Sequence, residues 1–129
     1  MNPPRRHAVF VYGTLKRGGS NHACLAGQHC VGPARSAPGY TLVSLGDYPG
    51  LIRHAEDTAG VAGELWLVDD EALAVLDDLE GVAEGLYTRI NLALRQPAGH
   101  ATALAYLYAR SVAGRSVIGD NWPVRPPPG

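Results

Sequence analysis

A glycine-rich loop near the start of the chain offers backbone groups that could hold a negatively charged ligand. The apolar run at 8–12 is rich in β-branched and aromatic residues, which is typical of a buried strand, and it ends at Gly13. The loop at 13–20 reads GTLKRGGS and presents several N–H groups to an anion or a carbonyl oxygen. A P-loop would place a lysine directly before the serine, where this chain has Gly19. The pattern therefore disfavours a nucleotide site and leaves an anion cradle or a plain glycine-rich turn.

Three carboxylates crowd into the end of the clearest predicted helix. Asp77, Asp78 and Glu80 directly precede Gly81, at the end where the helix dipole is negative. Repulsion between the acids, the dipole and any desolvation all favour the protonated form. We therefore expect a raised carboxyl pKa, in the range that is useful for proton transfer. The alternative is that all three acids are solvated, with one of them paired to an arginine.

Four side chains of metal-binding type lie close together in the sequence, namely His22, Cys24, His29 and Cys30. Structural zinc sites usually join two separated ligand pairs across a fold, so this spacing argues against a metal site. The cysteines are better interpreted as small buried residues. No third group is evident that would orient a cysteine–histidine pair for nucleophilic attack.

Glu64 is a second candidate for acid/base chemistry. It interrupts the apolar run at 61–68, so its carboxylate must be paired or exposed if that strand is buried. A solvent-facing position or an arginine partner is the simpler interpretation. Tyr87, Tyr106 and Tyr108 are expected to be aromatic residues of the core or its rim, with hydroxyls that find a partner.

The elements that must position these groups are mostly strands. Besides 8–12, strands are predicted at 39–44, 48–53, 61–68, 89–95 and 101–109, with another beginning near 28 and one or two helical turns at 21–27. Asp69 or Asp70 can cap a helix that Gly81 would end. Its predicted buried face comprises Ala72, Val75, Leu76 and Leu79. Many strands and few helices in mixed order predict an α+β domain with a curved or barrel-like sheet.

Composition narrows the class of protein further. The 129 residues, 46% hydrophobic and 18% charged, fit a single domain at 1–129, with its core at about 8–110 and a disordered proline-rich tail at 123–129. A formal net charge of -1 offers no footprint for nucleic acid or an anionic membrane, so a small molecule is the expected partner. No apolar stretch approaches the ~20 residues of a membrane span, and the cysteines fit reduced thiols. We therefore expect a cytoplasmic protein.

Several sequence blocks, taken together, resemble the γ-glutamylcyclotransferase family, and most of all its γ-glutamylamine cyclotransferases and small bacterial members. The blocks are VFVYGTLKRG at 9–18, NH at 21–22, GELW at 63–66, LDDLEG at 76–81 and LYTR at 86–89. The ending IGDNW at 118–122 is similar to a Gly-Asp-Trp close found in many members. It carries the extra Asn121, so no site role is assigned to that segment or to Trp122.

The resemblance implies a compact mixed-sheet barrel with few short helices and no metal or organic cofactor. It implies that Glu80 is the general acid/base. The residues that it places in contact with a γ-glutamyl substrate are Tyr12, Gly13, Thr14, Leu15 and Tyr87.

The implied reaction releases 5-oxoproline, because the α-amine of a γ-glutamyl compound attacks its own γ-carbonyl and needs no nucleophile from the protein. A carboxyl with a raised pKa, such as Glu80, would move the protons. The N–H groups after Tyr12 would hold the substrate carboxylate or the developing oxyanion. The competing hypothesis is a non-catalytic protein that binds a small ligand on the same fold.

Overall fold

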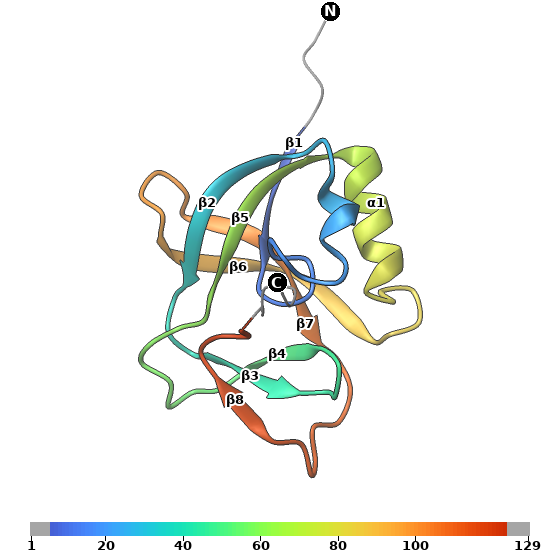
Figure 1. Ribbon diagram of the computed structural model, residues 1–129. Helices are drawn as coiled ribbons and strands as arrows, with labels where there is room; N and C mark the ends of the chain where they lie inside the picture. Colours follow the sequence, from blue (N-terminus) through green and yellow to red (C-terminus); the bar gives the residue numbers. More distant parts are fainter. Residues whose placement is uncertain (1–5, 124–129) are drawn as a thin grey trace, which may run out of the picture.

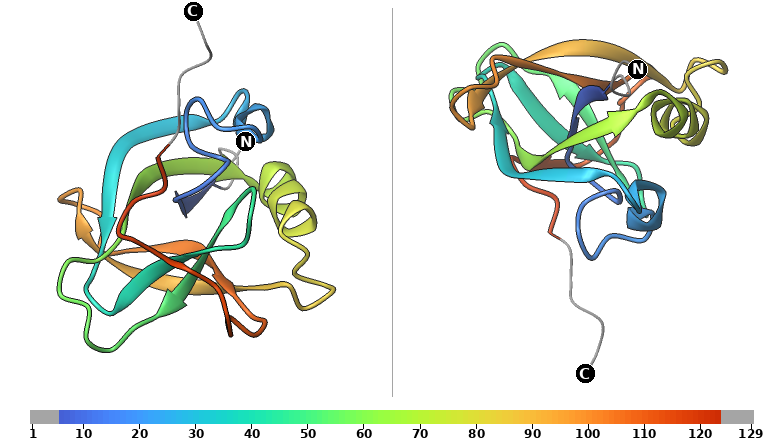
Figure 2. Two further views of the ribbon diagram at one scale, coloured as in Figure 1. Left: turned by 60° about the horizontal axis from the view of Figure 1, so that its bottom comes forward. Right: turned by 90° about the horizontal axis from the view of Figure 1, so that it is seen from above.

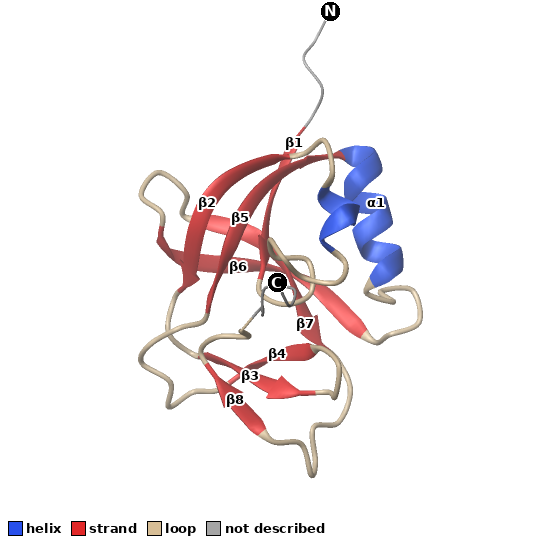
Figure 3. Cartoon of the chain, viewed as in Figure 1, coloured by secondary structure: helices blue, strands red, loops and turns tan. Residues whose placement is uncertain are grey.

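The computed structural model describes residues 6–123, which form a mixed β-sheet with helical segments packed at one side (Figures 1 and 3). The elements in chain order are β1 (Arg6–Val11), the 3-10 helix η1 (His22–Leu25), β2 (His29–Ser36), β3 (Tyr40–Ser44), β4 (Pro49–Arg53), β5 (Ala62–Asp69), α1 (Asp70–Leu79), β6 (Tyr87–Gln96), β7 (Thr102–Tyr108) and β8 (Val117–Gly119). The expected tail at 123–129 lies outside the described residues, apart from Pro123. Within 6–123, no helix is both long and apolar enough to cross a bilayer.

Local pattern predicted most of these elements. The predicted strands are confirmed with small shifts at their ends, and the turns expected at 21–27 contain η1. The antiparallel pairs β3–β4 and β6–β7 form hairpins. The short strand β8 was not predicted, because it lies in a segment rich in glycine and proline and is defined by its pairing with β3.

The sheet curls on itself. Its strand order is β1-β5-β2-β6-β7-β4-β3-β8, and β1 also meets β7 in parallel at Val9 and Leu104. The strands from β1 to β7 in this order therefore form a ring, from which β4, β3 and β8 continue as an arm. Figure 2 shows the ring from above, with α1 outside it. The predicted barrel-like mixed sheet is confirmed, as a ring closed at a single residue pair and not as a complete barrel.

The second half of β1, residues 9–11, is buried on both faces, which explains why this stretch is entirely apolar. Successive side chains of a strand point to opposite sides. Val9 and Val11 accordingly join the apolar cluster under α1 and η1, while Phe10 and Tyr12 join the second cluster, which extends toward β3 and β4. Packing on both faces therefore fixes the end of β1, and with it the start of the loop that follows Tyr12.

The helix α1 begins and ends as its sequence predicts. The Asp69 carboxylate accepts a hydrogen bond from the Ala72 N–H at 2.7 Å, and Gly81 stops the helix with a φ of 63°. The predicted buried face is only half right, because Val75 and Leu79 are 48% and 40% exposed. Leu73 lies in the core instead. The four predicted positions belong to two neighbouring stripes of the helix surface. The stripe with Ala72 and Leu76 is buried in the core, and the stripe with Val75 and Leu79 is not.

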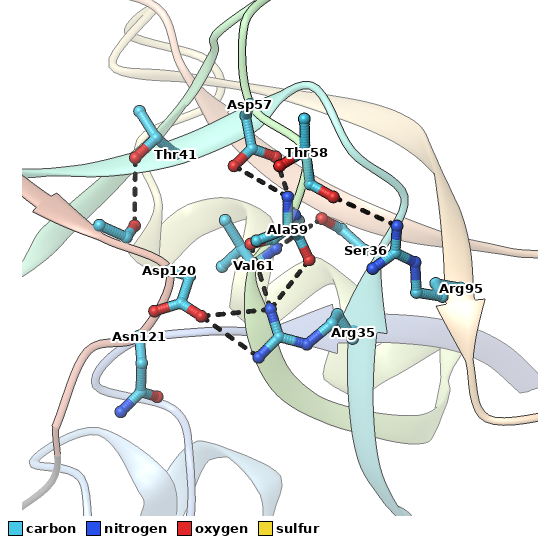
Figure 4. A network of polar contacts seen from close by, with 12 residues as sticks. Arg35, Ser36, Thr41, Asp57, Thr58, Ala59, Val61, Arg95, Asp120 and Asn121 are labelled. Atoms are coloured by element: carbon cyan, nitrogen blue, oxygen red, sulfur yellow. Dashed lines mark hydrogen bonds and ion pairs between the residues drawn. The ribbon is translucent and has the colours of Figure 1, made fainter.

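A polar network fastens the end of the described chain to β2 (Figure 4). The Arg35 guanidinium contacts the Asp120 carboxylate at 3.3 Å and donates to the Ala59 carbonyl at 2.9 Å. The Asp57 carboxylate accepts N–H groups from Gly39 and Gly60. These contacts give the segment that follows β8 a structural role.

Candidate active site

A cavity of about 350 Å³ lies between the loop after β1 and the end of α1. Every site residue predicted from the sequence lines it, namely Tyr12, Gly13, Thr14, Leu15, Glu80 and Tyr87. Tyr106, which the sequence suggested only as a core or rim aromatic residue, lines it too, as does Asp47, which the sequence did not single out. The fold thus brings the glycine-rich loop and the acidic helix end to one space.

The loop presents unused backbone donors to this cavity. Among residues 6–123, no acceptor bonds to the N–H of Gly13, Thr14 or Leu15. The carbonyls of the loop, in contrast, are engaged: Gly13 accepts from Lys16 N–H at 3.1 Å, and Thr14 accepts from Asn21 N–H at 2.9 Å. Consecutive free N–H groups beside a cavity suit an anion or a carbonyl oxygen, so the geometry favours a cradle over a plain turn.

Two glycines allow the loop to turn this tightly. A Cβ atom at Gly13 would lie 2.8 Å from Cγ of Pro49, and one at Gly19 would lie 2.1 Å from the Thr14 carbonyl oxygen. Asn21 braces the same turn, since its Nδ2 donates to Thr14 Oγ1 at 2.9 Å. The position where a P-loop has lysine is therefore filled by a residue that must lack a side chain.

Glu80 caps the C-terminus of α1, and its backbone N–H donates to the Leu76 carbonyl at 2.9 Å. Its side chain is half-buried, and this burial raises its pKa from 4.5 to about 7. The expected direction of the change is confirmed. Among the causes expected from the sequence, desolvation of the carboxylate is the one that raises this pKa, and the neighbouring acids do not contribute.

The neighbouring acids are accounted for separately. Asp77 pairs with Arg89 and accepts a hydrogen bond from the Tyr106 hydroxyl at 2.8 Å. Asp78 is exposed. The alternative expected for this cluster therefore holds for Asp77 and Asp78, while Glu80 alone faces the cavity.

The tyrosines of the cavity use their hydroxyls within the fold. The Tyr12 hydroxyl donates to the Tyr106 carbonyl at 2.7 Å and accepts from Leu51 N–H at 3.3 Å. The Tyr87 hydroxyl donates to the Pro49 carbonyl at 2.8 Å. Burial raises the pKa of Tyr12 and of Tyr87 above the ordinary tyrosine value, so both stay neutral. They shape the wall of the cavity and do not offer ionised oxygens.

Glu64, the second acid/base candidate, is absent from the lining of this cavity. Its Oε1 accepts from Arg17 N–H at 3.0 Å and from Trp66 Nε1 at 3.2 Å. It therefore pins the outer side of the loop to β5. The place of Glu64 in an apolar strand predicts a partner for its carboxylate. The partners are the backbone N–H of Arg17 and the indole N–H of Trp66, and not an arginine side chain.

The four residues of metal-binding type are dispersed. His22 Nδ1 lies 3.0 Å from the Leu15 carbonyl oxygen, and its ring meets the edge of Trp66. Cys24 and Cys30 pack against the core, and His29 is exposed. Within the part of the chain that the structure describes, no three His, Cys, Asp or Glu side chains are grouped to hold a metal ion.

Comparison with known proteins places these features in a family. A family model described as Gamma-glutamyl cyclotransferase, AIG2-like, matches residues 9–123. The γ-glutamylcyclotransferase family protein ytfP of Citrobacter rodentium is 35% identical over 120 residues, which are 88% of this chain and 93% of that protein. The γ-glutamylaminecyclotransferase of Rattus norvegicus is 37% identical over 94 residues, 67% of this chain, which span only 62% of the rat protein.

The fold agrees with this match. The crystal structure of an AIG2-like protein from Mus musculus superposes with a TM-score of 0.66 at 26% identity, covering 83% of this chain and 78% of that one. The family model covers both the glycine-rich loop and Glu80. The chain belongs to the AIG2-like γ-glutamyl cyclotransferase family.

Proposed function

We propose that the protein is a γ-glutamyl cyclotransferase that releases 5-oxoproline and a free amine or amino acid from a γ-glutamyl compound. One observation carries the proposal. The Glu80 carboxyl, with a pKa of about 7, and the free N–H groups of Gly13, Thr14 and Leu15 line the same cavity. Membership of the family and the activity named for the rat relative support the reaction class.

In the proposed reaction Glu80 moves two protons. It first accepts one from the α-ammonium of the substrate, which frees the lone pair of the nitrogen to attack the γ-carbonyl carbon. The new C–N bond closes a five-membered ring, and the carbonyl electrons move to oxygen. When the oxyanion collapses, Glu80 gives this proton to the departing nitrogen as the bond to the amine breaks. The Glu80 carboxylate then takes the second proton from the ring nitrogen, which becomes the amide N–H of 5-oxoproline, and releases it to solvent. Its pKa suits both transfers near neutral pH.

The free backbone N–H groups of the loop are the positive ends of peptide dipoles, and they would attract a negatively charged part of the substrate. These N–H groups would hold the α-carboxylate of the substrate or the oxyanion, without the cost of reorienting solvent. Tyr12 and Tyr87 would confine the γ-glutamyl chain so that amine and carbonyl meet. No protein nucleophile is required, because both reacting atoms belong to the substrate.

A 5-oxoproline assay tests this proposal directly. The protein is incubated with γ-glutamyl-ε-lysine, a γ-glutamyl amino acid and glutathione, and we expect 5-oxoproline from at least one of them. Glu80→Gln should lower kcat/KM by about 10²- to 10⁴-fold while the protein stays folded. The control is Asp78→Asn, which removes an exposed charge from the same turn and should leave turnover unchanged.

The outcomes separate the enzyme from the alternative binding protein. Full activity in Glu80→Gln would remove Glu80 from the mechanism. Absence of product from all three substrates at high enzyme concentration, together with calorimetric binding of 5-oxoproline, would favour a non-catalytic protein on this fold.

We also propose the cytoplasm as the compartment of this protein. Cys24 and Cys30 are both free thiols, as a reducing compartment would keep them. Fractionation of cells that express a tagged protein would test this, and recovery in an extracytoplasmic fraction would contradict it.

A further inference from the structure

The side-chain charges that line the cavity are all negative. Asp47 and Glu80 contribute carboxylates, and no lysine, arginine or histidine among residues 6–123 lines the cavity. The donors that it offers are the backbone N–H groups of the loop and uncharged side chains such as those of Ser20 and Asn21. The loop can therefore bind one anionic group of a ligand, and no cationic side chain of the lining neutralises a second one.

The basic side chains nearest to the cavity in sequence are engaged elsewhere. The Lys16 ammonium donates to the Trp122 carbonyl, and the Arg17 guanidinium lies 5.9 Å from the ring centre of Trp66. Arg89, beyond the end of α1, is paired with Asp77. None of them is available to a carboxylate in the cavity without breaking its present contacts.

The residues that line the cavity differ in their exposure to solvent. Tyr12, Leu15 and Tyr87 are buried, whereas Asp47 is exposed and Tyr48 is 40% exposed, although both line the cavity. A residue that both lines a cavity and meets solvent lies at its mouth. Asp47 and Tyr48 belong to the turn between β3 and β4, so this side of the mouth carries a carboxylate next to an aromatic residue. The exposed lining residues Ser20 and Leu79 are uncharged, which leaves Asp47 as the charged side chain of the mouth.

We infer that this mouth selects γ-glutamyl compounds whose leaving amine bears a second, cationic group and no carboxylate. A diamine with one γ-glutamyl group is such a compound. This selectivity rests on the proposed function. With the γ-glutamyl group between the loop and Glu80, the leaving amine extends toward the mouth. There an ammonium group meets the Asp47 carboxylate and the face of Tyr48, which both attract it. A leaving group with a carboxylate meets repulsion from Asp47 instead.

Three substrates of similar length and different terminal charge test the selectivity. They are the mono-γ-glutamyl derivative of 1,4-diaminobutane, γ-glutamyl-n-pentylamine and γ-glutamyl-4-aminobutyrate, with 5-oxoproline as the common product. We expect kcat/KM to fall from the cationic to the neutral to the anionic compound, by about fivefold at each step, as for an exposed ion pair. The differences should shrink at about 0.5 M salt, because exposed charges are screened.

Variants assign the selectivity to Asp47. Asp47→Asn should bring the cationic substrate to within about twofold of the neutral one, and Asp47→Lys should favour the anionic one. The matched control is Glu56→Gln, which removes an exposed carboxylate that does not line the cavity and should keep the original order.

The possible results are distinguishable. Equal kcat/KM for the three compounds, or a preference that survives Asp47→Asn, would overturn the selectivity and leave the cyclotransferase proposal standing. Absence of 5-oxoproline from these compounds and from the three substrates named for the proposed function would overturn that function instead.

Discussion

Glu80 is costly to keep charged in the folded protein. Its carboxyl is half-buried at the end of a helix, and burial alone raises its pKa to about 7. The same desolvation that makes the group suitable for proton transfer therefore opposes folding whenever the group is ionised. The protonation state of Glu80 therefore affects both turnover and stability. Both should change with pH between the pKa of Glu80 in the unfolded chain and its pKa in the folded protein.

Stability should fall as this carboxyl ionises. Below its ordinary pKa of 4.5 Glu80 is protonated in both states, whereas between 4.5 and about 7 only the unfolded chain releases the proton. Glu80→Gln removes this loss, so its unfolding free energy relative to the natural protein should improve by up to about 3 kcal/mol from pH 4 to pH 8. Urea denaturation at both pH values measures the difference. Parallel pH dependences would contradict the burial of the carboxyl.

Turnover should show the opposite dependence. Only the ionised carboxylate accepts a proton from the substrate, so kcat/KM should rise with pH through an inflection near the Glu80 pKa of about 7. A pH–rate profile between about pH 5 and 8.5 measures it. A flat profile over this range would contradict the assignment of Glu80 as the group that accepts the proton.

At the scale of elements, the end of α1 is held by an acid other than the proposed catalytic one. Asp77 joins the last turn of the helix to both strands of the β6–β7 hairpin, through Arg89 on β6 and the Tyr106 hydroxyl on β7. Glu80 follows directly after this turn. Its position over the cavity therefore depends on a helix end that is fixed to the sheet.

Breaking this attachment should affect turnover and stability together. Asp77→Ala leaves the Tyr106 hydroxyl without its acceptor, and we expect a loss of about 1–2 kcal/mol in stability and roughly tenfold in kcat. Thermal unfolding and the 5-oxoproline assay measure both. Asp78→Ala is the matched control, because Asp78 is exposed in the same turn. Similar behaviour of the two variants would show that Asp77 does not position the helix end.

At the scale of the whole molecule, the segment after β8 supports the loop after β1. Lys16 is only 8% exposed, and its ammonium donates to the Trp122 carbonyl and to Asn121 Oδ1. Asp120 in the same segment pairs with Arg35 on β2. The segment after β8 thus braces the loop through residues that do not line the cavity.

Removing the lysine should loosen the loop without touching the cavity lining. Lys16→Met keeps the length of the side chain and loses both hydrogen bonds, so we expect faster hydrogen exchange at 13–20 and a loss of about 1–3 kcal/mol in stability. Hydrogen-exchange mass spectrometry locates the change. Arg53→Met, on the exposed end of β4, is the control. Unchanged exchange at 13–20 would mean that the segment after β8 does not support the loop.

Features that depend on near neighbours in the chain could be predicted from the amino-acid sequence. Alternation and apolar runs predicted the longer strands, Asp69 and Gly81 marked the ends of α1, and the blocks around Tyr12 and Glu80 identified the family and the candidate site. These features follow from local conformational preference and side-chain spacing, which a short stretch of sequence contains in full.

The surroundings of those groups, in contrast, are defined by the folded structure and could not be predicted from the sequence. In the folded protein Val75 is exposed to solvent, and Asp77 pairs with Arg89 and accepts a hydrogen bond from Tyr106. Glu64 accepts a hydrogen bond from the loop, and Asp47 lies at the mouth of the cavity. The structure also shows that burial raises the pKa of Glu80, where the sequence suggested crowding as well. Burial and charge pairing depend on residues far apart in the chain, so they become defined only when the ring of strands closes and α1 packs against it.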